Sequence, residues 1–108
     1  MARTSARSKQ SAGAFAATNM PVNSVLPAIT GTATVGQTLT CSSGTWSKSP
    51  TYAYQWQRGG NPIIGATAST RVLAGADEGA LMTCTVKATN SGVSAVATSA
   101  ATAAIAAA

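Results

Sequence analysis

The sequence predicts an all-β domain in which about seven short antiparallel strands form a two-layered sandwich. Three features of the chain point to this fold. From Val25 onwards, apolar and polar residues alternate in short stretches, as they do in half-buried strands. Turn residues separate these stretches about every eight to twelve positions. The two cysteines lie on two of these stretches, with a tryptophan between them in the chain.

The first two strands are expected before and around the first cysteine. An extended stretch covers Leu26 to Thr34, and Pro27 within it has no N–H to donate, which places this strand at the edge of a sheet. The next stretch, Gln37 to Ser42, alternates strictly, with Leu39 and Cys41 on one face and threonines on the other. The Ser- and Gly-rich residues that follow predict a loop.

The central strands lie around the second tryptophan. Tyr52 to Arg58 alternates again and places Tyr52, Tyr54 and Trp56 on one face. A strong turn signal, Gly59-Gly60-Asn61-Pro62, ends this strand. Two shorter strands are then expected, at Ile63–Ile64 and at Thr70–Leu73.

The clearest alternation of the chain runs from Leu81 to Thr89. Its apolar face consists of Met82, Cys84, Val86 and Ala88. Asn90-Ser91-Gly92 predicts a hairpin turn, after which a last strand runs from Val93 to about Thr102. The residues expected in the core are Leu39, Tyr54, Trp56, Met82 and Val86.

Composition divides the chain into three parts. Residues 1–24 form a basic, Ala- and Ser-rich extended arm, residues 25–102 form the sandwich, and residues 103–108 form an Ala-rich tail that is too short to nucleate a helix alone. A secretory signal peptide is disfavoured because the apolar segment near the start is short and lacks leucine. No apolar run approaches the about 20 residues of a membrane span.

Basic residues are concentrated in the arm. The formal net charge is +5, and three of the seven basic residues, Arg3, Arg7 and Lys9, lie within the first nine positions. Three interpretations fit this cluster: a solvated tail, an arm that docks on an acidic protein surface, and a contact to nucleic acid. Nucleic-acid binding is the least favoured, because it calls for stacking aromatics and the first twenty residues contain only Phe15.

The residue types that catalysis and metal binding require are nearly absent. The chain has no His, two Cys and two acids, which are the neighbours Asp77 and Glu78. Paired carboxylates, a His-activated nucleophile and the usual zinc or calcium ligand sets therefore lack their parts. We expect neither an enzyme nor a cofactor or metal site. Asp77 is expected to accept hydrogen bonds from the backbone of its own turn.

Several motifs follow one another in a fixed order. The chain contains Ile29-Thr-Gly-Thr-Ala-Thr-Val-Gly-Gln-Thr-Leu-Thr-Cys41, Gly44-Thr-Trp-Ser47, Tyr54-Gln-Trp-Gln-Arg58, Ile64-Gly-Ala-Thr67, Ala76-Asp-Glu-Gly79 and Cys84-Thr-Val-Lys-Ala-Thr-Asn90. Over about residues 27–100 this series resembles bacterial and phage immunoglobulin-like domains, and it implies an immunoglobulin-like β-sandwich. Such domains recur in virion proteins of tailed phages and in bacterial surface proteins, where they serve as scaffolds and binding surfaces.

The resemblance places Cys41 and Cys84 on facing strands, where we expect an inter-sheet disulfide. The alternative is a pair of buried thiols that pack as small apolar groups. Two positions depart from the family pattern. Met82 stands where antibody-type domains place a tyrosine, and Arg71 stands where the family often carries an aromatic. An arginine at a core-facing position must reach the rim or find a partner.

Trp46 lies in a loop, and two roles are open for it. It could be a structural feature of the domain, as the resemblance implies, or an exposed anchor or sugar-stacking platform. In the second case Trp46, Lys48 and Arg71 form the expected surface interface.

The resemblance and the basic arm together predict a virion structural protein of a tailed bacteriophage. We expect a capsid decoration (auxiliary head) protein that is made in the host cytoplasm and sits on the outer capsid surface. Its partner would be the major capsid protein or another virion protein, with further copies of itself in addition. Neither a nucleic acid nor a membrane is expected, and a host-surface glycan stays open as a partner without support in the sequence. The residues expected to dock the arm are Arg3, Arg7, Lys9, Phe15, Met20 and Val22. The alternatives are a tail or head fibre module and a secreted or cell-surface adhesion domain that binds glycans or proteins.

Overall fold

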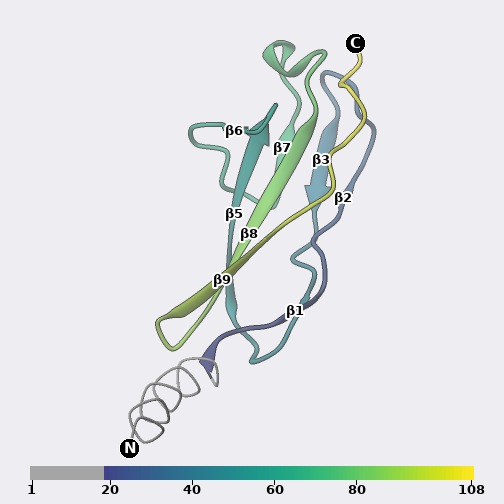
Figure 1. Ribbon diagram of the computed structural model, residues 1–108. Helices are drawn as coiled ribbons and strands as arrows, with labels where there is room; N and C mark the ends of the chain where they lie inside the picture. The colour runs from purple at the N-terminus through teal and green to yellow at the C-terminus, as the bar shows by residue number, and fades with distance from the viewer. Residues whose placement is uncertain (1–18) are drawn as a thin grey trace, which may run out of the picture.

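A computed structural model of the chain describes residues 19–108 (Figure 1). Arg3, Arg7, Lys9 and Phe15 of the expected arm lie outside the described residues. Among residues 19–108, no helix has the length and apolar character needed to cross a membrane.

The described chain consists of short strands and one short 3₁₀ helix. In chain order these are β1 (Asn23–Val25), β2 (Ile29–Thr30), β3 (Thr38–Cys41), β4 (Thr45–Trp46), β5 (Thr51–Arg58), β6 (Asn61–Pro62), β7 (Thr70–Val72), η1 (Gly75–Asp77), β8 (Met82–Asn90) and β9 (Val93–Thr98). All pairings between these strands are antiparallel. The prediction of an all-β chain is confirmed.

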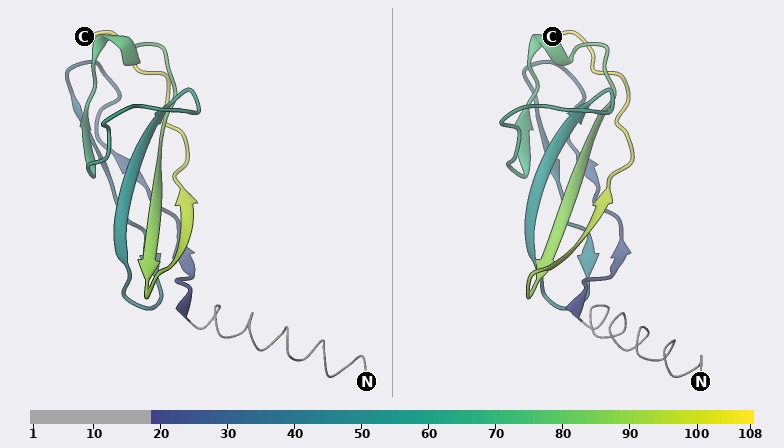
Figure 2. Two further views of the ribbon diagram at one scale, coloured as in Figure 1. Left: turned by 90° about the vertical axis from the view of Figure 1, so that its left-hand side faces the viewer. Right: turned by 60° about the vertical axis from the view of Figure 1, so that its left-hand side comes forward.

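Two sheets form the layers of a sandwich, as Figures 1 and 2 show. One layer has the strand order β2-β3-β7 and the other β6-β5-β8-β9. The small pair β1-β4 closes the end of the sandwich that lies near the turn between β8 and β9. Asn19 lies at this end, because the side-chain amide of Asn90 donates to its carbonyl oxygen (3.0 Å), and Ala108 lies at the opposite end (Figure 1).

The long pair β5-β8 organises the core. Its register sets Trp56 opposite Cys84 and Tyr54 opposite Val86. In β8 the side chains alternate as predicted, with Met82, Cys84, Val86 and Ala88 fully buried. The same alternation buries Leu39 and Cys41 on β3 in the facing sheet.

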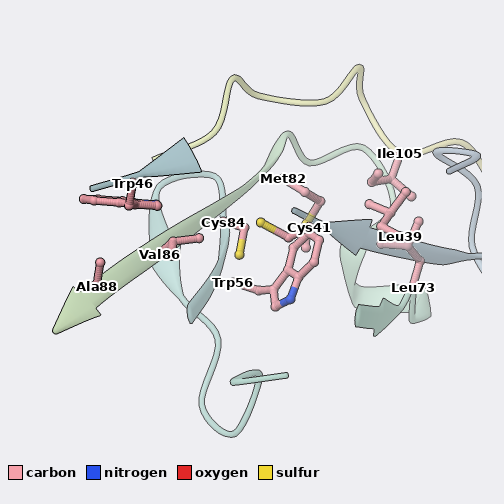
Figure 3. Packing of buried hydrophobic residues seen from close by; sticks show 10 residues of the cluster. All are labelled: Leu39, Cys41, Trp46, Trp56, Leu73, Met82, Cys84, Val86, Ala88 and Ile105. Carbon is pink, nitrogen blue, oxygen red and sulfur yellow. The ribbon is translucent and has the colours of Figure 1, made fainter. Parts of the chain in front are cut away.

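The indole of Trp56 lies in the middle of the core, beside Met82 and the two cysteines (Figure 3). It is completely buried, and its Nε1–H donates to the carbonyl oxygen of Ala68 (2.8 Å). The expected core residues Leu39, Trp56, Met82 and Val86 are buried, whereas Tyr54 is partly buried against their cluster.

The strand expected at Ile63–Ile64 is found two residues earlier. Gly59 and Gly60 both adopt positive φ (56° and 87°) and form a tight turn that pairs Asn61 and Pro62 with the end of β5. Ile63 then packs against the core and Ile64 points fully into solvent. The prediction missed this because it treated Asn61 and Pro62 as part of the turn.

The Ala-rich residues 103–108, set apart as a tail by composition, contribute to the core. Ile105 is buried next to Leu39 and Leu73 (Figure 3). Parallel bridges join Thr34 to Ala106 and Glu78 to Ile105. The physical reason is that a domain with so few large side chains gains most from burying the single isoleucine of this segment.

At the other boundary, the sandwich begins earlier than the sequence suggested. Asn23 and Ser24 fall within the residues assigned to the arm, yet they belong to β1, which pairs with β4. Pro21 is buried as well.

Trp46 is part of the core and is not a surface anchor. Only 9% of the surface of Trp46 is exposed to solvent, and its Nε1–H donates to the carbonyl oxygen of Ser43 (2.7 Å). Of the two roles left open for Trp46, the structural one is therefore confirmed and the surface interface is contradicted. The loop before Trp46 packs closely against β1, where a side chain at Gly44 would collide with the backbone of Val25.

We predict that Trp56→Ala and Trp46→Ala each lower the free energy of unfolding by about 3 to 5 kcal/mol, because each removes a large buried side chain from a small core. Guanidinium unfolding monitored by circular dichroism measures both changes. A loss below about 1 kcal/mol for Trp46→Ala would contradict its placement in the core, since exposed positions rarely cost more.

Candidate functional site

Three charged side chains meet at the end of the sandwich near η1. Asp77 of η1 is completely buried, and Arg58 at the end of β5 and Arg71 of β7 converge on its carboxylate. Nε of Arg58 donates to Oδ1 (2.7 Å), while Nε and Nη2 of Arg71 donate to Oδ2 (3.2 and 2.9 Å). The backbone N–H of Ala74 also donates to Oδ2 (2.9 Å), as expected for a turn aspartate.

This cluster is structural. Burial raises the pKa of Asp77, but the Ala74 N–H and the two guanidinium groups outweigh it and hold that pKa below its ordinary value. Both carboxylate oxygens are occupied by donors, so Asp77 cannot exchange a proton with a substrate. Arg71 faces the core and is paired there with Asp77. The expectation that it belongs to a surface interface is therefore wrong.

Replacing Asp77 tests the cluster, and the exposed neighbour Glu78 provides a control with the same change of charge. We predict that Asp77→Asn lowers the free energy of unfolding by about 3 kcal/mol, near the low end for breaking a buried ion pair because Arg58 is partly exposed. Glu78→Gln should change it by less than about 0.5 kcal/mol. Equal effects of the two variants would contradict a special role for Asp77.

The lowered pKa of Asp77 makes the stability of the fold depend on pH. The stabilisation by Asp77 is fully present above its unfolded pKa of about 3.9 and is lost as the pH falls through the lower pKa of the folded state. Wild-type protein should therefore lose stability below about pH 4, and Asp77→Asn should remove most of that loss. Thermal unfolding between pH 2 and 7 measures it.

Cys41 and Cys84 face each other across the two sheets (Figure 3). The structure holds both as buried free thiols, so the expected disulfide is not formed in it. The contact between the thiols raises the pKa of Cys84 and lowers that of Cys41, and burial raises both. Burial of both thiols in the core argues against a redox role for the pair.

We predict that Ellman's reagent labels neither cysteine in the folded protein, because both sulfur atoms are buried, and labels both after unfolding in guanidinium. If no thiol appears after unfolding without reductant, the pair is a disulfide in the isolated protein.

Charge is distributed unevenly over the described chain. Every charged residue of this part lies between Lys48 and Lys87, and residues 19–47 and 88–108 carry none. Lys48 is exposed in the loop before β5. Trp46 lies at one end of the core, and Leu73, which directly follows β7 with its Arg71, lies at the other (Figure 3). The structure therefore does not bring Trp46, Lys48 and Arg71 together.

The uncharged part carries an exposed apolar segment, residues 19–29, which we call the N-terminal leg. Met20, Val22, Val25 and Leu26 of the leg are all exposed. Met20 and Val22 are the two expected docking residues that the structure describes. Four exposed apolar side chains within seven positions make the leg the candidate contact surface of the described chain.

A shallow groove of about 420 Å³ runs along this leg. One wall is the leg itself, and the other is the segment after β9. The lining residues are Val25, Leu26, Pro27, Ala28, Ile29, Ala100, Ala101 and Thr102. The groove is apolar and is open to solvent, which suits an extended or flat protein surface better than a small polar molecule.

Within residues 19–108, no cluster of His, Cys, Asp or Glu could hold a metal ion. In comparisons with known proteins, the chain matches no family model and no curated protein. Of the features found, sequence reasoning missed Arg58 and the groove. The core-facing position of Arg71 signalled that a partner was needed, but nothing in the sequence pointed to Arg58.

Proposed function

We propose that the protein is a virion structural protein of a tailed bacteriophage, a capsid decoration protein that docks on the shell through its N-terminal arm and leg. In this proposal the sandwich is an immunoglobulin-like domain that projects from the shell or clamps neighbouring capsid subunits. The proposal rests on the sequence resemblance and on the exposed apolar leg.

The strand order supports an immunoglobulin-like assignment. The order β2-β3-β7 against β6-β5-β8-β9 places the first cysteine strand in one sheet and the second in the other, with Trp56 on the strand that neighbours β8. Sandwiches of this family have that arrangement of the cysteines and the tryptophan.

The observation that carries the docking proposal is the position of the leg. Its four exposed apolar side chains lie in a part of the chain without charge, and two of them, Val25 and Leu26, line the groove. Contact through the leg would bury apolar area worth about 25 cal/mol per Å². The basic residues Arg3, Arg7 and Lys9 would add salt-sensitive attraction of about 0.2 to 1 kcal/mol for each exposed pair.

The structure weakens the alternative of an adhesion domain that binds glycans. Sugar stacking was assigned to Trp46, and that indole is buried. Trp56 is buried as well, and Tyr54 is half-buried. Among the described residues, Tyr52 is the one exposed aromatic that a sugar could stack on, whereas the leg exposes four apolar side chains, and this balance favours a protein contact over a glycan contact.

Docking can be tested on particles of the phage that encodes the chain, purified without this protein and then incubated with it. We predict that the double variant Val22→Lys/Leu26→Lys lowers occupancy at least about tenfold, since two charges would be buried in an apolar contact. Deletion of residues 1–18 should abolish binding and leave the thermal unfolding of the sandwich nearly unchanged.

Ile64→Lys is the matched control, because it places a lysine at an exposed apolar position outside the leg. It should bind like wild type. Undiminished binding by the leg variant would refute docking through the leg, and no binding by wild-type protein would refute the capsid proposal. Copy number on native particles, from quantitative mass spectrometry, separates a shell protein from a fibre module.

A further inference from the structure

Strand β9 has a free edge. It is the last strand of the order β6-β5-β8-β9, and within residues 19–108 no strand or bridge pairs with its outer side. β9 lies in front of its sheet in Figure 1, with that edge uncovered by the described chain. Open edges of this kind offer unpaired N–H and C=O groups to another strand.

The turn before β9 determines which backbone groups lie on this edge. Ser91 and Gly92 both have positive φ (51° and 79°), so they form a two-residue type I′ turn closed by Asn90 and Val93. In such a hairpin alternate residues face the partner strand. Val93, Ala95 and Ala97 therefore direct their backbone groups to β8. The backbone groups of Ser94, Val96 and Thr98 point to the open side.

The other outer strands of the two sandwich sheets, β6, β2 and β7, are protected against pairing, whereas β9 is not. β6 is two residues long and contains Pro62, and β2 is two residues long and lies between Pro27 and Gly31. β7 is three residues long and carries Arg71. β9 has six residues with neither proline nor charge. Natural edges avoid pairing by shortness, proline or charge, and β9 has none of these.

The edge of β9 is complementary to itself. In an antiparallel pair of two β9 strands with a two-fold axis at Val96, Val96 lies opposite Val96 of the second copy and Ser94 lies opposite its Thr98. All three positions face outward, so each opposed pair can exchange N–H···O=C bonds. The valines form an apolar cross-strand pair and the hydroxyl side chains a polar one, both of which are favourable.

Charge selects the same surface. Two copies that each carry +5 repel one another, and they approach most easily where neither presents a charge. Residues 88–108 carry none. The nearest charge is Lys87, which lies opposite Val96 on β8. In the paired dimer, Lys87 of one copy and Lys87 of the other would be three strand spacings apart, which is about 14 Å. This distance exceeds the screening length of about 8 to 10 Å.

We infer that β9 is an interface for a second copy of this chain. Antiparallel β9–β9 pairing about Val96 joins the two four-stranded sheets into one continuous sheet across the dimer. The contact is small, so it is weak in free solution. This inference concerns the isolated protein and does not depend on a role in a virion.

A charge at position 96 tests the pairing, because the two-fold axis sets it against its own copy. Val96→Lys should weaken self-association at least about tenfold. Val72→Lys is the matched control, since Val72 is also a strand-edge valine and both side chains are 64% exposed. Sedimentation velocity of the full chain, up to about 1 mM, measures the shift from 10.6 kDa towards twice that mass.

A charge-swap experiment identifies the register. Val96→Glu alone should also be monomeric, and an equimolar mixture of Val96→Lys and Val96→Glu should recover the dimer, because opposite charges then face each other. Thermal unfolding of each variant establishes that it is folded.

Three results would overturn the inference. They are a wild-type chain that stays monomeric up to about 1 mM, equal weakening by Val96→Lys and Val72→Lys, and a mixture that remains monomeric.

Discussion

The structure depends on the burial of Trp56 between two sheets that have little else to bury. Val, Ile, Leu and Phe together supply 16 of the 108 residues, so each large apolar side chain has to serve the core. The indole lies at the centre, and small residues such as Ala88 and the two cysteines allow the sheets to approach it. Leu39, Leu73 and Ile105 fill one end of the core, and Trp46 and Val86 fill the other (Figure 3).

Beyond Leu73 and Ile105 the described core has no further large side chain. There the Asp77 cluster holds the strands together. One carboxylate joins the end of β5, 19 positions away in sequence, to β7 and to the turn that follows β7. The described side chains include no buried polar atom without a partner. A buried charge is tolerated here because five donor contacts from two guanidinium groups and one amide replace its water.

Much of the fold could be predicted from the sequence, because β3 and β8 alternate between buried and more exposed positions. β5 alternates in sequence but buries only Trp56 completely. Single residues that act alone could not be predicted. Ile105 stands in a run of alanines without a period, and Arg58 lies 19 positions from Asp77 with no pattern to connect them. Trp46 was ambiguous since loop position alone does not reveal which way an indole turns. The groove arises from two segments more than 70 positions apart and has no local signal.

The two ends of the described chain have a mechanical consequence. The leg leaves the sandwich near the β8–β9 turn, while the last residues lie at the far end and are held by the parallel bridges of Ile105 and Ala106 (Figure 1). Tension between a tethered leg and the last residues would run along the length of the domain. It would act first on the backbone hydrogen bonds that hold Ile105 and Ala106, which we call the terminal clasp. Their partners are Ala33, Val35, Gly79 and Ala80. The clasp can open while β5 and β8 remain paired, so a stretched molecule would lengthen by a short segment before its centre gives way.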